Sequence, residues 1–272
     1  MRLTSRLGQI RSEVKAFIID RISLSHVRAS AAHLLDMVFP PHRLDAPDEM
    51  TSPEALMGAG LSAAAWSGIR FLDRDGCAMC ARPFEGGLFL GSGALCSECT
   101  EKPFPFRQTR AACLYDEASK GVILGFKHAD RLDMAPMLTR WLERAGADLI
   151  READIVMPVP LHPFRLIQRR YNQAAELARP VARRLNRTYL GDVLKRTRHT
   201  NQVGKGAQAR WDSVRGAFRV SARGHKHIAG KSVVLIDDVF TTGATLRACT
   251  EAVLAAGAIR VDVCVLARAV RH

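Results

Sequence analysis

The sequence predicts an α/β fold built on a parallel sheet with helices on both faces, and three observations point to it. An unbroken aliphatic run, Val233 to Ile236, is typical of a strand buried on both faces of such a sheet. The apolar spacing from Leu246 to Ala256 predicts a helix that ends at Gly257. A second buried strand is predicted from Asp154 to Pro160, where prolines end it.

Length and charge narrow the class of protein. The chain has 272 residues, 47% of them hydrophobic, which is enough for a sizeable core in one or two domains. It contains no apolar run of the roughly 18 to 20 residues that a membrane span needs and no signal-peptide pattern, so we expect a cytoplasmic protein without a membrane span. The formal charge is +13, and the segment from Arg151 to Arg223 holds sixteen Lys and Arg against five Asp and Glu. An anionic partner, either a diphosphate or a nucleic acid, would match this surplus, and simple solubility is the alternative.

The N-terminal segment carries no chemical motif. Residues 1 to 44 have apolar side chains at helical spacing as far as Pro40 and Pro41, which predicts one or two amphipathic helices. From Asp45 to about Ala63 the composition is small, polar and rich in turn formers, as in a linker. We therefore expect residues 1–70 to form a helical extension and linker.

Two cysteine pairs predict a metal site. Cys77 and Cys80 are followed after fifteen residues by Cys96 and Cys99, a spacing in the range for a tetrahedral zinc site whose pairs lie on tight turns. Disulfides or free thiols are the alternative, but an odd total of seven cysteines fits a reducing compartment better. We predict a structural zinc ribbon over residues 71–103, in which metal binding supplies much of the folding free energy and the glycines between the pairs form a short hairpin.

The aliphatic run at 233–236 leads directly into a candidate ligand site. Asp237 and Asp238 stand at the carboxyl end of the predicted strand, the edge at which open α/β sheets bind ligands. The turn that leads into the predicted helix consists of Thr241, Thr242, Gly243, Ala244 and Thr245. Carboxylates can accept hydrogen bonds from vicinal sugar hydroxyls, and hydroxyls with backbone amides at a helix N-terminus can hold a phosphate. This predicts a site for a phosphorylated ribose, because the complete Gly-x4-Gly-Lys-Ser/Thr loop that a Walker B strand needs does not occur.

Basic side chains follow the strand at 154–160. Arg165, Arg169 and Arg170 lie in the loop after its carboxyl end, where guanidinium groups could stabilise a departing diphosphate. A solvated surface loop is the alternative reading of the same residues.

A second basic segment has the character of a lid. Residues 195–217 show neither helical nor strand periodicity, which favours a long loop that acts as a lid or a binding element. Arg196 and Arg210 in this segment are candidate ligand-binding residues. Further upstream, Lys127 and His128 could face a ligand, and a solvated turn explains them equally well.

The order of these motifs resembles the ComF family, bacterial double-zinc-ribbon, phosphoribosyltransferase-like proteins linked to competence for DNA uptake. The resemblance runs from about Phe71 to the C-terminus and is carried by the Pro-Val-Pro strand end, R-x3-R-R-Y-N-Q and D-D-V-F-T-T-G. Family members generally carry two ribbons, but no cysteine precedes Cys77, so the first ribbon is missing here. The resemblance implies a type I phosphoribosyltransferase fold over residues 104–272, preceded by the zinc ribbon and the helical extension.

The resemblance also implies roles for the candidate residues. Asp237 and Asp238 would bind the ribose hydroxyls of phosphoribosyl diphosphate (PRPP), and the turn at 241–245 would bind its 5-phosphate. The arginines after the Pro-Val-Pro strand end would hold the diphosphate, with Mg²⁺ bridging it to the sugar. Three functions stay open: transfer of the phosphoribosyl group to a nitrogen acceptor, sensing of PRPP or a nucleotide without turnover, and binding of single-stranded DNA during uptake.

Overall fold

The computed structural model describes residues 61–72, 74, 76–88, 90–128, 132–161, 171–197, 214 and 216–270. The chain divides into two compact units, Met1–Ala63 and Ala64–His272, and the sheet and its helices belong to the second. The predictions for residues 1–60 lie outside the described residues, as do those for Arg165, Arg169, Arg170 and Arg210. Within the described part of the chain, no helix has the length and apolar character needed to cross a membrane.

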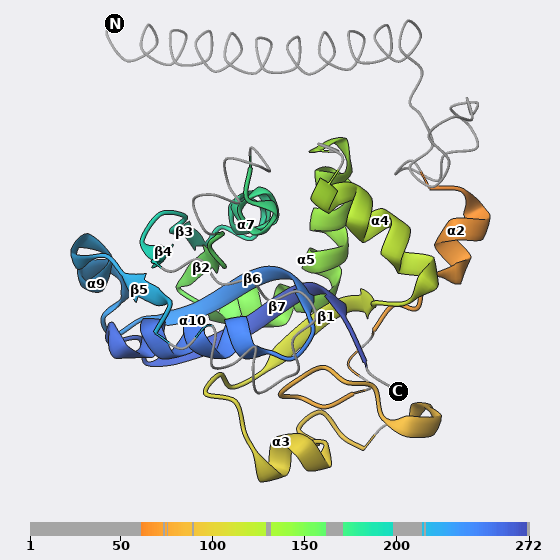
Figure 1. The fold of residues 1–272 in the computed structure, drawn as a ribbon, viewed down its shortest axis with the longest axis horizontal. Coiled ribbons are helices and arrows are strands. Elements are labelled where there is room, and N and C mark those ends of the chain that lie inside the picture. Colours follow the sequence, from red (N-terminus) through yellow and green to blue (C-terminus); the bar gives the residue numbers. More distant parts are fainter. Residues whose placement is uncertain are drawn as a thin grey trace, which may run out of the picture. The chain divides into compact units, whose positions relative to one another are not determined.

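A five-stranded sheet forms the centre of this unit (Figure 1). The strand order is β1-β7-β6-β2-β3, and every neighbouring pair is parallel. The bounds are β1 Thr109–Leu114, β2 Ile155–Pro158, β3 Thr188–Tyr189, β6 Ser232–Phe240 and β7 Arg260–Arg268. Most side chains of the central strands are buried, as the unbroken aliphatic runs in the sequence predicted.

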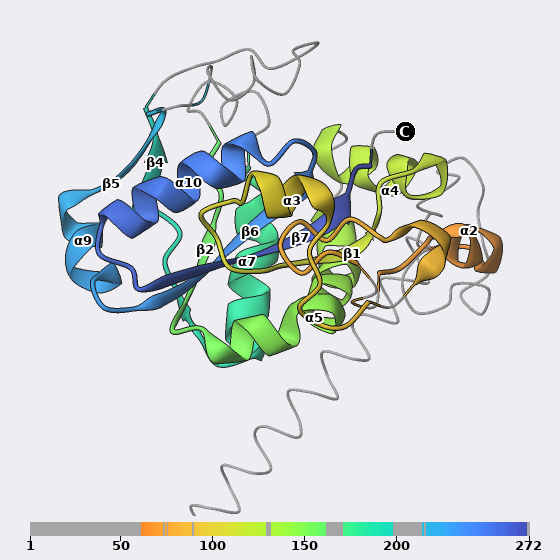
Figure 2. The same cartoon turned by 90° about the horizontal axis from the view of Figure 1, so that it is seen from below.

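Helices cover both faces of the sheet, which confirms the predicted fold class. On one face lie α5 and α7, which contact each other as well as the strands, and on the other face lies α10 (Figures 1 and 2). The bounds are α4 Glu117–His128, α5 Ala135–Glu152, α7 Gln173–Arg184 and α10 Ala244–Ala255, with the 3-10 helix η3 Leu132–Met134 between α4 and α5. Asn172 caps the N-terminus of α7, and its side chain accepts a hydrogen bond from the Ala174 amide at 3.1 Å.

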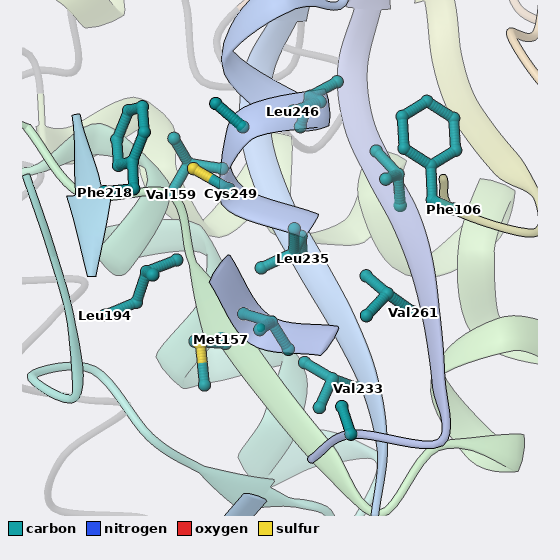
Figure 3. Packing of buried hydrophobic residues seen from close by; sticks show 14 of the residues in the cluster. Phe106, Met157, Val159, Leu194, Phe218, Val233, Leu235, Leu246, Cys249 and Val261 are labelled. Atoms are coloured by element: carbon teal, nitrogen blue, oxygen red, sulfur yellow. The ribbon is translucent and has the colours of Figure 1, made fainter. Parts of the chain in front are cut away.

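One hydrophobic core lies between the sheet and α10. Leu235 and Val261 project from β6 and β7 toward Leu246 and Cys249 of α10 (Figure 3). All four are at most 2% exposed. Burial of each such side chain contributes about 1.5–3 kcal/mol to folding, so the cluster fixes the position of α10 on the sheet.

Strand β6 is longer than the sequence predicted. The predicted strand ended at Ile236, but β6 continues to Phe240 because β7 remains beside it as far as the pair Phe240↔Arg268. On its other side β6 loses its neighbour earlier, since the last pair with β2 is Pro158↔Ile236. Asp237 and Asp238 therefore lie inside the strand, where one edge is paired and the other is open.

A small antiparallel ribbon stands apart from the main sheet. Strand β4 Leu194–Arg196 pairs with β5 Phe218–Val220, which precedes helix α9 Ala222–Ile228. The prediction of a loop from residue 195 was wrong at its start, because Lys195 and Arg196 belong to β4. Lys195 and Arg196 form a strand because they pair with β5, which is distant in the chain, and the local sequence does not show this pairing.

The cysteine segment packs against the same unit. Between the pairs, the described residues include the 3-10 helix η2 Glu85–Gly87 and no strand, so the predicted hairpin was wrong for them. Helix α3 Ser97–Glu101 carries the last cysteine. Before the pairs, α2 Ala63–Gly68 is anchored by Trp66, which lies 5.8 Å, ring centroid to ring centroid, from Trp141 of α5.

Candidate functional site

A cavity of about 290 Å³ lies at the carboxyl ends of the central strands. The predicted ligand residues that the structure describes all line it: Asp237, Asp238, Thr241, Thr242, Gly243, Ala244, Thr245 and Arg196. The structure thus brings together a carboxylate pair, a hydroxyl-rich turn and one distant arginine. The four other predicted arginines lie outside the described residues.

The two carboxylates are held by backbone amides and by a lysine. The Asp238 amide donates to Oδ1 of Asp237 at 2.9 Å, and the Val239 amide donates to Oδ1 of Asp238 at 2.6 Å. Lys127 Nζ lies 3.1 Å from Oδ2 of Asp238, and both side chains are less than one fifth exposed. The structure therefore decides between the two interpretations of Lys127, which belongs to the cavity wall and not to a solvated turn.

The environment of Asp237 keeps this carboxyl group protonated near neutral pH. Burial, followed by the negative charge of Asp238, raises the pKa of Asp237 to about 8. The Asp238 amide and the positive charges of Lys127 and Arg196 act in the opposite direction and only partly offset these effects. A ligand that supplies hydroxyl donors or positive charge would favour the ionised form.

This raised pKa predicts a pH-dependent cost to folding. Because the unfolded carboxyl titrates near 3.8, the folded protein holds a proton that the unfolded chain has released, and the free energy of unfolding falls as pH rises from about 4 to about 8. Each pH unit in this window is worth up to about 1.4 kcal/mol. We expect the gain in melting temperature from Asp237→Asn to be larger at pH 8 than at pH 5.

The matched control for this experiment is Glu251→Gln, which removes an exposed carboxylate from α10. Its difference in melting temperature from the unaltered protein should not change with pH over the same range. A constant difference for Asp237→Asn between pH 5 and pH 8 would contradict the assignment of a raised pKa to this carboxyl group.

The turn after β6 has the geometry of an anion cradle. Gly243 is the N-cap of α10 and has a φ of 75°, which L side chains rarely adopt. A Cβ atom at Gly243 would lie 2.5 Å from Cε1 of Phe104 and 2.7 Å from Cε2 of Phe240, so only glycine fits. Within the described part of the chain, no protein group accepts a hydrogen bond from the backbone amides of residues 241–245. These amides remain available to an anion at the helix N-terminus.

Two further residues complete the wall of the cavity. Arg196 ends β4, is 8% exposed and has its guanidinium carbon 5.5 Å from the centre of the Phe218 ring. Tyr115 follows β1, and the sequence predictions did not include it. The signal that could have found it is its place after a strand, because the carboxyl ends of parallel strands meet at one edge of the sheet.

The four predicted metal ligands also come together. The Sγ atoms of Cys77, Cys80, Cys96 and Cys99 all lie within 4.8 Å of one another, and none of these cysteines forms a disulfide. Three of them are buried, and Cys96 is partly exposed. Four convergent thiols form the donor set of a closed tetrahedral site, so the cluster could bind a metal such as zinc.

Comparison with known proteins extends these observations. Residues 172–271 match the family model described as "Phosphoribosyl transferase domain". Competence protein F of Haemophilus influenzae is 31% identical over 217 residues, which cover 68% of this chain and 94% of that protein. DNA utilization protein YhgH of Escherichia coli K12 is 28% identical over 202 residues, covering 72% of this chain and 85% of that protein.

Similarity to solved structures is weaker. Orotate phosphoribosyltransferase from Aeropyrum pernix aligns with 52% of this chain and 75% of its own, at 15% identity and a TM-score of 0.31. The relationship to Competence protein F is much closer and spans nearly the whole of that protein. The identity to Competence protein F, the coverage of both chains and the phosphoribosyltransferase domain at residues 172–271 show that the chain belongs to the ComF family.

Proposed function

We propose that the cavity at the carboxyl end of β6 binds PRPP or a ribose 5-phosphate nucleotide with Mg²⁺, and that the protein transfers the phosphoribosyl group to a nitrogen acceptor. One observation carries the proposal. Asp237, Asp238 and the turn at 241–245 line the same cavity of about 290 Å³, so hydroxyl acceptors and a phosphate cradle face one ligand.

Different residues bind the ribose and the phosphate of the ligand. The carboxylates of Asp237 and Asp238 accept hydrogen bonds from the 2- and 3-hydroxyls of the ribose, and the Thr hydroxyls and free amides of residues 241–245 donate to the 5-phosphate. Lys127 holds the Asp238 side chain in place through its 3.1 Å ion pair. Both oxygens of Asp237 can accept hydrogen bonds from ribose hydroxyls only when this carboxyl group has lost its proton. PRPP binding therefore strengthens as the pH rises toward the Asp237 pKa of about 8.

In transfer, the bond between C1 of the ribose and the diphosphate oxygen breaks, and its electron pair leaves with the diphosphate. The lone pair of the acceptor nitrogen forms the new bond to C1, and the proton of that nitrogen passes to solvent. Mg²⁺, when bound with the substrate, would neutralise charge on the diphosphate. Arg196 in the cavity wall, with Arg165, Arg169, Arg170 and Arg210, stabilises the negative charge that develops on the leaving group.

Calorimetry with PRPP and Mg²⁺, followed by a diphosphate-release assay over a panel of nucleobases and amines, tests this function. We expect saturable binding that ribose 5-phosphate also shows and inorganic diphosphate alone shows more weakly, and release with at least one acceptor. Binding without release over the panel would favour a sensing module instead. Absence of binding by PRPP and by ribose 5-phosphate would refute the assignment of the cavity.

A second candidate function is the binding of single-stranded DNA. It is favoured by the names of the relatives, Competence protein F and DNA utilization protein YhgH, and by the basic surplus between Arg151 and Arg223. Such binding should weaken steeply with salt because phosphate contacts release counterions. DNA affinity that follows this salt dependence and is unchanged by saturating PRPP would indicate a DNA site separate from the ribose-phosphate cavity.

We also propose that the metal at the four cysteines is zinc and that it is structural. The four thiolates would fill all four positions of a tetrahedral site, which would leave no open position for a substrate.

A further inference from the structure

One buried arginine connects the cysteine cluster to the turn of the candidate site. Arg268, near the end of β7, is 5% exposed. Its Nε donates to the carbonyl oxygen of Cys80 at 2.7 Å, and its Nη1 donates to the carbonyl oxygens of Phe240 at 3.0 Å and Thr241 at 2.8 Å. A single planar group therefore contacts a metal-ligand turn on one side and the start of the anion cradle on the other.

The surroundings of Arg268 make these carbonyl contacts important. Among the described residues, no carboxylate lies in ion-pair contact with it, so backbone carbonyl dipoles stabilise its charge, together with the Phe240 ring, whose centre lies 4.4 Å from the guanidinium carbon. A buried charge that loses a hydrogen-bond partner is strongly destabilised. Movement of the Cys80 carbonyl would therefore force the guanidinium, and with it the Phe240–Thr241 backbone, to rearrange.

A second set of contacts reinforces the connection. Phe104 follows the last cysteine pair, its amide lies 3.2 Å from Sδ of Met79, and its ring fills the space beside Gly243. Arg247 in the first turns of α10 donates from Nη2 to the Pro103 carbonyl at 2.9 Å, and its guanidinium carbon lies 5.0 Å from the centre of the Phe104 ring. The segment that leaves the cysteine cluster thus contacts the turn at Gly243 and helix α10 at Arg247.

The cysteine cluster and the turn at 241–245 also line a common cavity. A cavity of about 100 Å³ is lined by Cys80 and Cys99 from the cluster, by Thr241 and Thr242 from the turn, and by Arg268. Thr241 and Thr242 line the larger ligand cavity as well. The buried thiols belong to the same hydrophobic cluster as the core residues of β6 and α10, so the cysteine segment is not an independent module.

We propose that Arg268 is a positioning residue that couples metal occupancy of the four-cysteine cluster to the affinity of the 241–245 turn for a ribose phosphate. The inference rests on the proposed function and adds a regulatory connection to it. With metal bound, the turn from Cys77 to Cys80 is fixed and its carbonyl holds Arg268 against Phe240 and Thr241. Without metal, that carbonyl is released, and the cradle loses its support. Because coupling between two sites is reciprocal, PRPP binding raises metal affinity by the same factor.

The test is a cycle of PRPP affinities measured by calorimetry on the full chain, with zinc and after zinc depletion. The unaltered protein should bind PRPP roughly tenfold more weakly after depletion, within the usual range of about 5- to 150-fold for coupled sites. Arg268→Gln should bind weakly in both states, with less than a twofold effect of zinc. Zinc affinity, measured against a chromogenic chelator, should rise with PRPP in the unaltered protein and not in Arg268→Gln.

Arg260→Gln is the matched control. It removes an arginine from the other end of β7, where Arg260 forms an ion pair with Asp262 at 3.2 Å and contacts neither site. This variant should retain the full response of PRPP affinity to zinc. If Arg268→Gln also retains that response, the proposed coupling is wrong. If Arg268→Gln does not fold, Arg268→Lys takes its place, since lysine keeps the charge but loses the planar fork, and the same two outcomes decide.

A measurement without PRPP separates this inference from the proposed function. Hydrogen exchange at the Ala269 amide, which donates to the Phe240 carbonyl at 2.9 Å, reports the position of the turn directly. We expect exchange to accelerate on zinc depletion in the unaltered protein and to be fast with or without zinc in Arg268→Gln. If zinc-loaded protein binds no PRPP but shows this pattern, the proposed function fails, while zinc still controls the position of the turn through Arg268. If PRPP binds while neither exchange nor affinity responds to zinc, the coupling fails alone.

Discussion

Replacement of both site carboxylates, in the variant Asp237→Asn with Asp238→Asn, is expected to lower PRPP affinity at least 100-fold and to leave the fold intact. Hydrogen bonds to charged groups contribute about 1.5–3 kcal/mol each, and loss of two of them corresponds to a factor of about 100 or more. The fold should persist because asparagine has nearly the shape of aspartate and because ionisation of Asp237 does not favour the folded state. Calorimetry with PRPP and Mg²⁺ measures the affinity.

Two comparisons make this result specific. Glu251→Gln also changes a carboxylate to an amide, but on an exposed position of α10 that does not line the cavity, and its affinity should equal that of the unaltered protein. Circular dichroism and melting curves show whether the double variant is folded. A folded double variant with unchanged PRPP affinity would remove the carboxylates from the binding site, and the proposed function with them.

Introduction of a side chain at Gly243 is the second change with a large expected effect. Gly243→Ala combines two penalties: about 1–3 kcal/mol for a non-glycine residue at its φ of 75°, and about 1–3 kcal/mol for overpacking against the rings of Phe104 and Phe240. We expect the free energy of unfolding in denaturant to fall by the sum of these terms, about 2–6 kcal/mol. PRPP affinity should fall as well, because the new methyl group displaces the turn.

Gly230→Ala separates the two penalties. Gly230 has a φ of 72°, nearly the same as Gly243, but no atom lies within 4 Å of the position of an added Cβ. This variant should show the backbone penalty alone and should bind PRPP normally. Equal losses of stability for the two variants would mean that the aromatic rings yield without cost and do not hold the turn.

The parts of the site that are contiguous in the chain could be predicted from the sequence. The carboxylate pair and the turn at 241–245 lie on one strand, one turn and one helix N-terminus, so their proximity follows from local chain geometry. The same is true of the cysteine pairs, because each C-x2-C unit brings two thiols together within one turn. The layered α/β arrangement followed from aliphatic runs and helical spacing for the same reason.

The other parts of the site depend on contacts between segments that are distant in the chain, and the sequence alone does not show which segments are in contact. Lys127 pairs with Asp238 across more than a hundred residues, and a lysine near the end of a helix has no feature that marks it as buried. Arg268 stands in an apolar strand where its role depends on carbonyl groups, which carry no sequence signal at all. The extension of β6 to Phe240 likewise results from the length of β7 and not from the residues of β6.

The unequal lengths of the neighbours of β6 have a consequence for how the ligand space arises. The pairing with β2 stops at Pro158, while the pairing with β7 continues to Phe240, and this difference leaves a step in the sheet beside the two aspartates. Pro160, two residues past the end of β2, has no N–H group with which to extend the ladder. The opening is thus created by backbone chemistry at a neighbouring chain segment, and an insertion that lengthened β2 by two residues would close it even if every ligand-facing side chain were preserved.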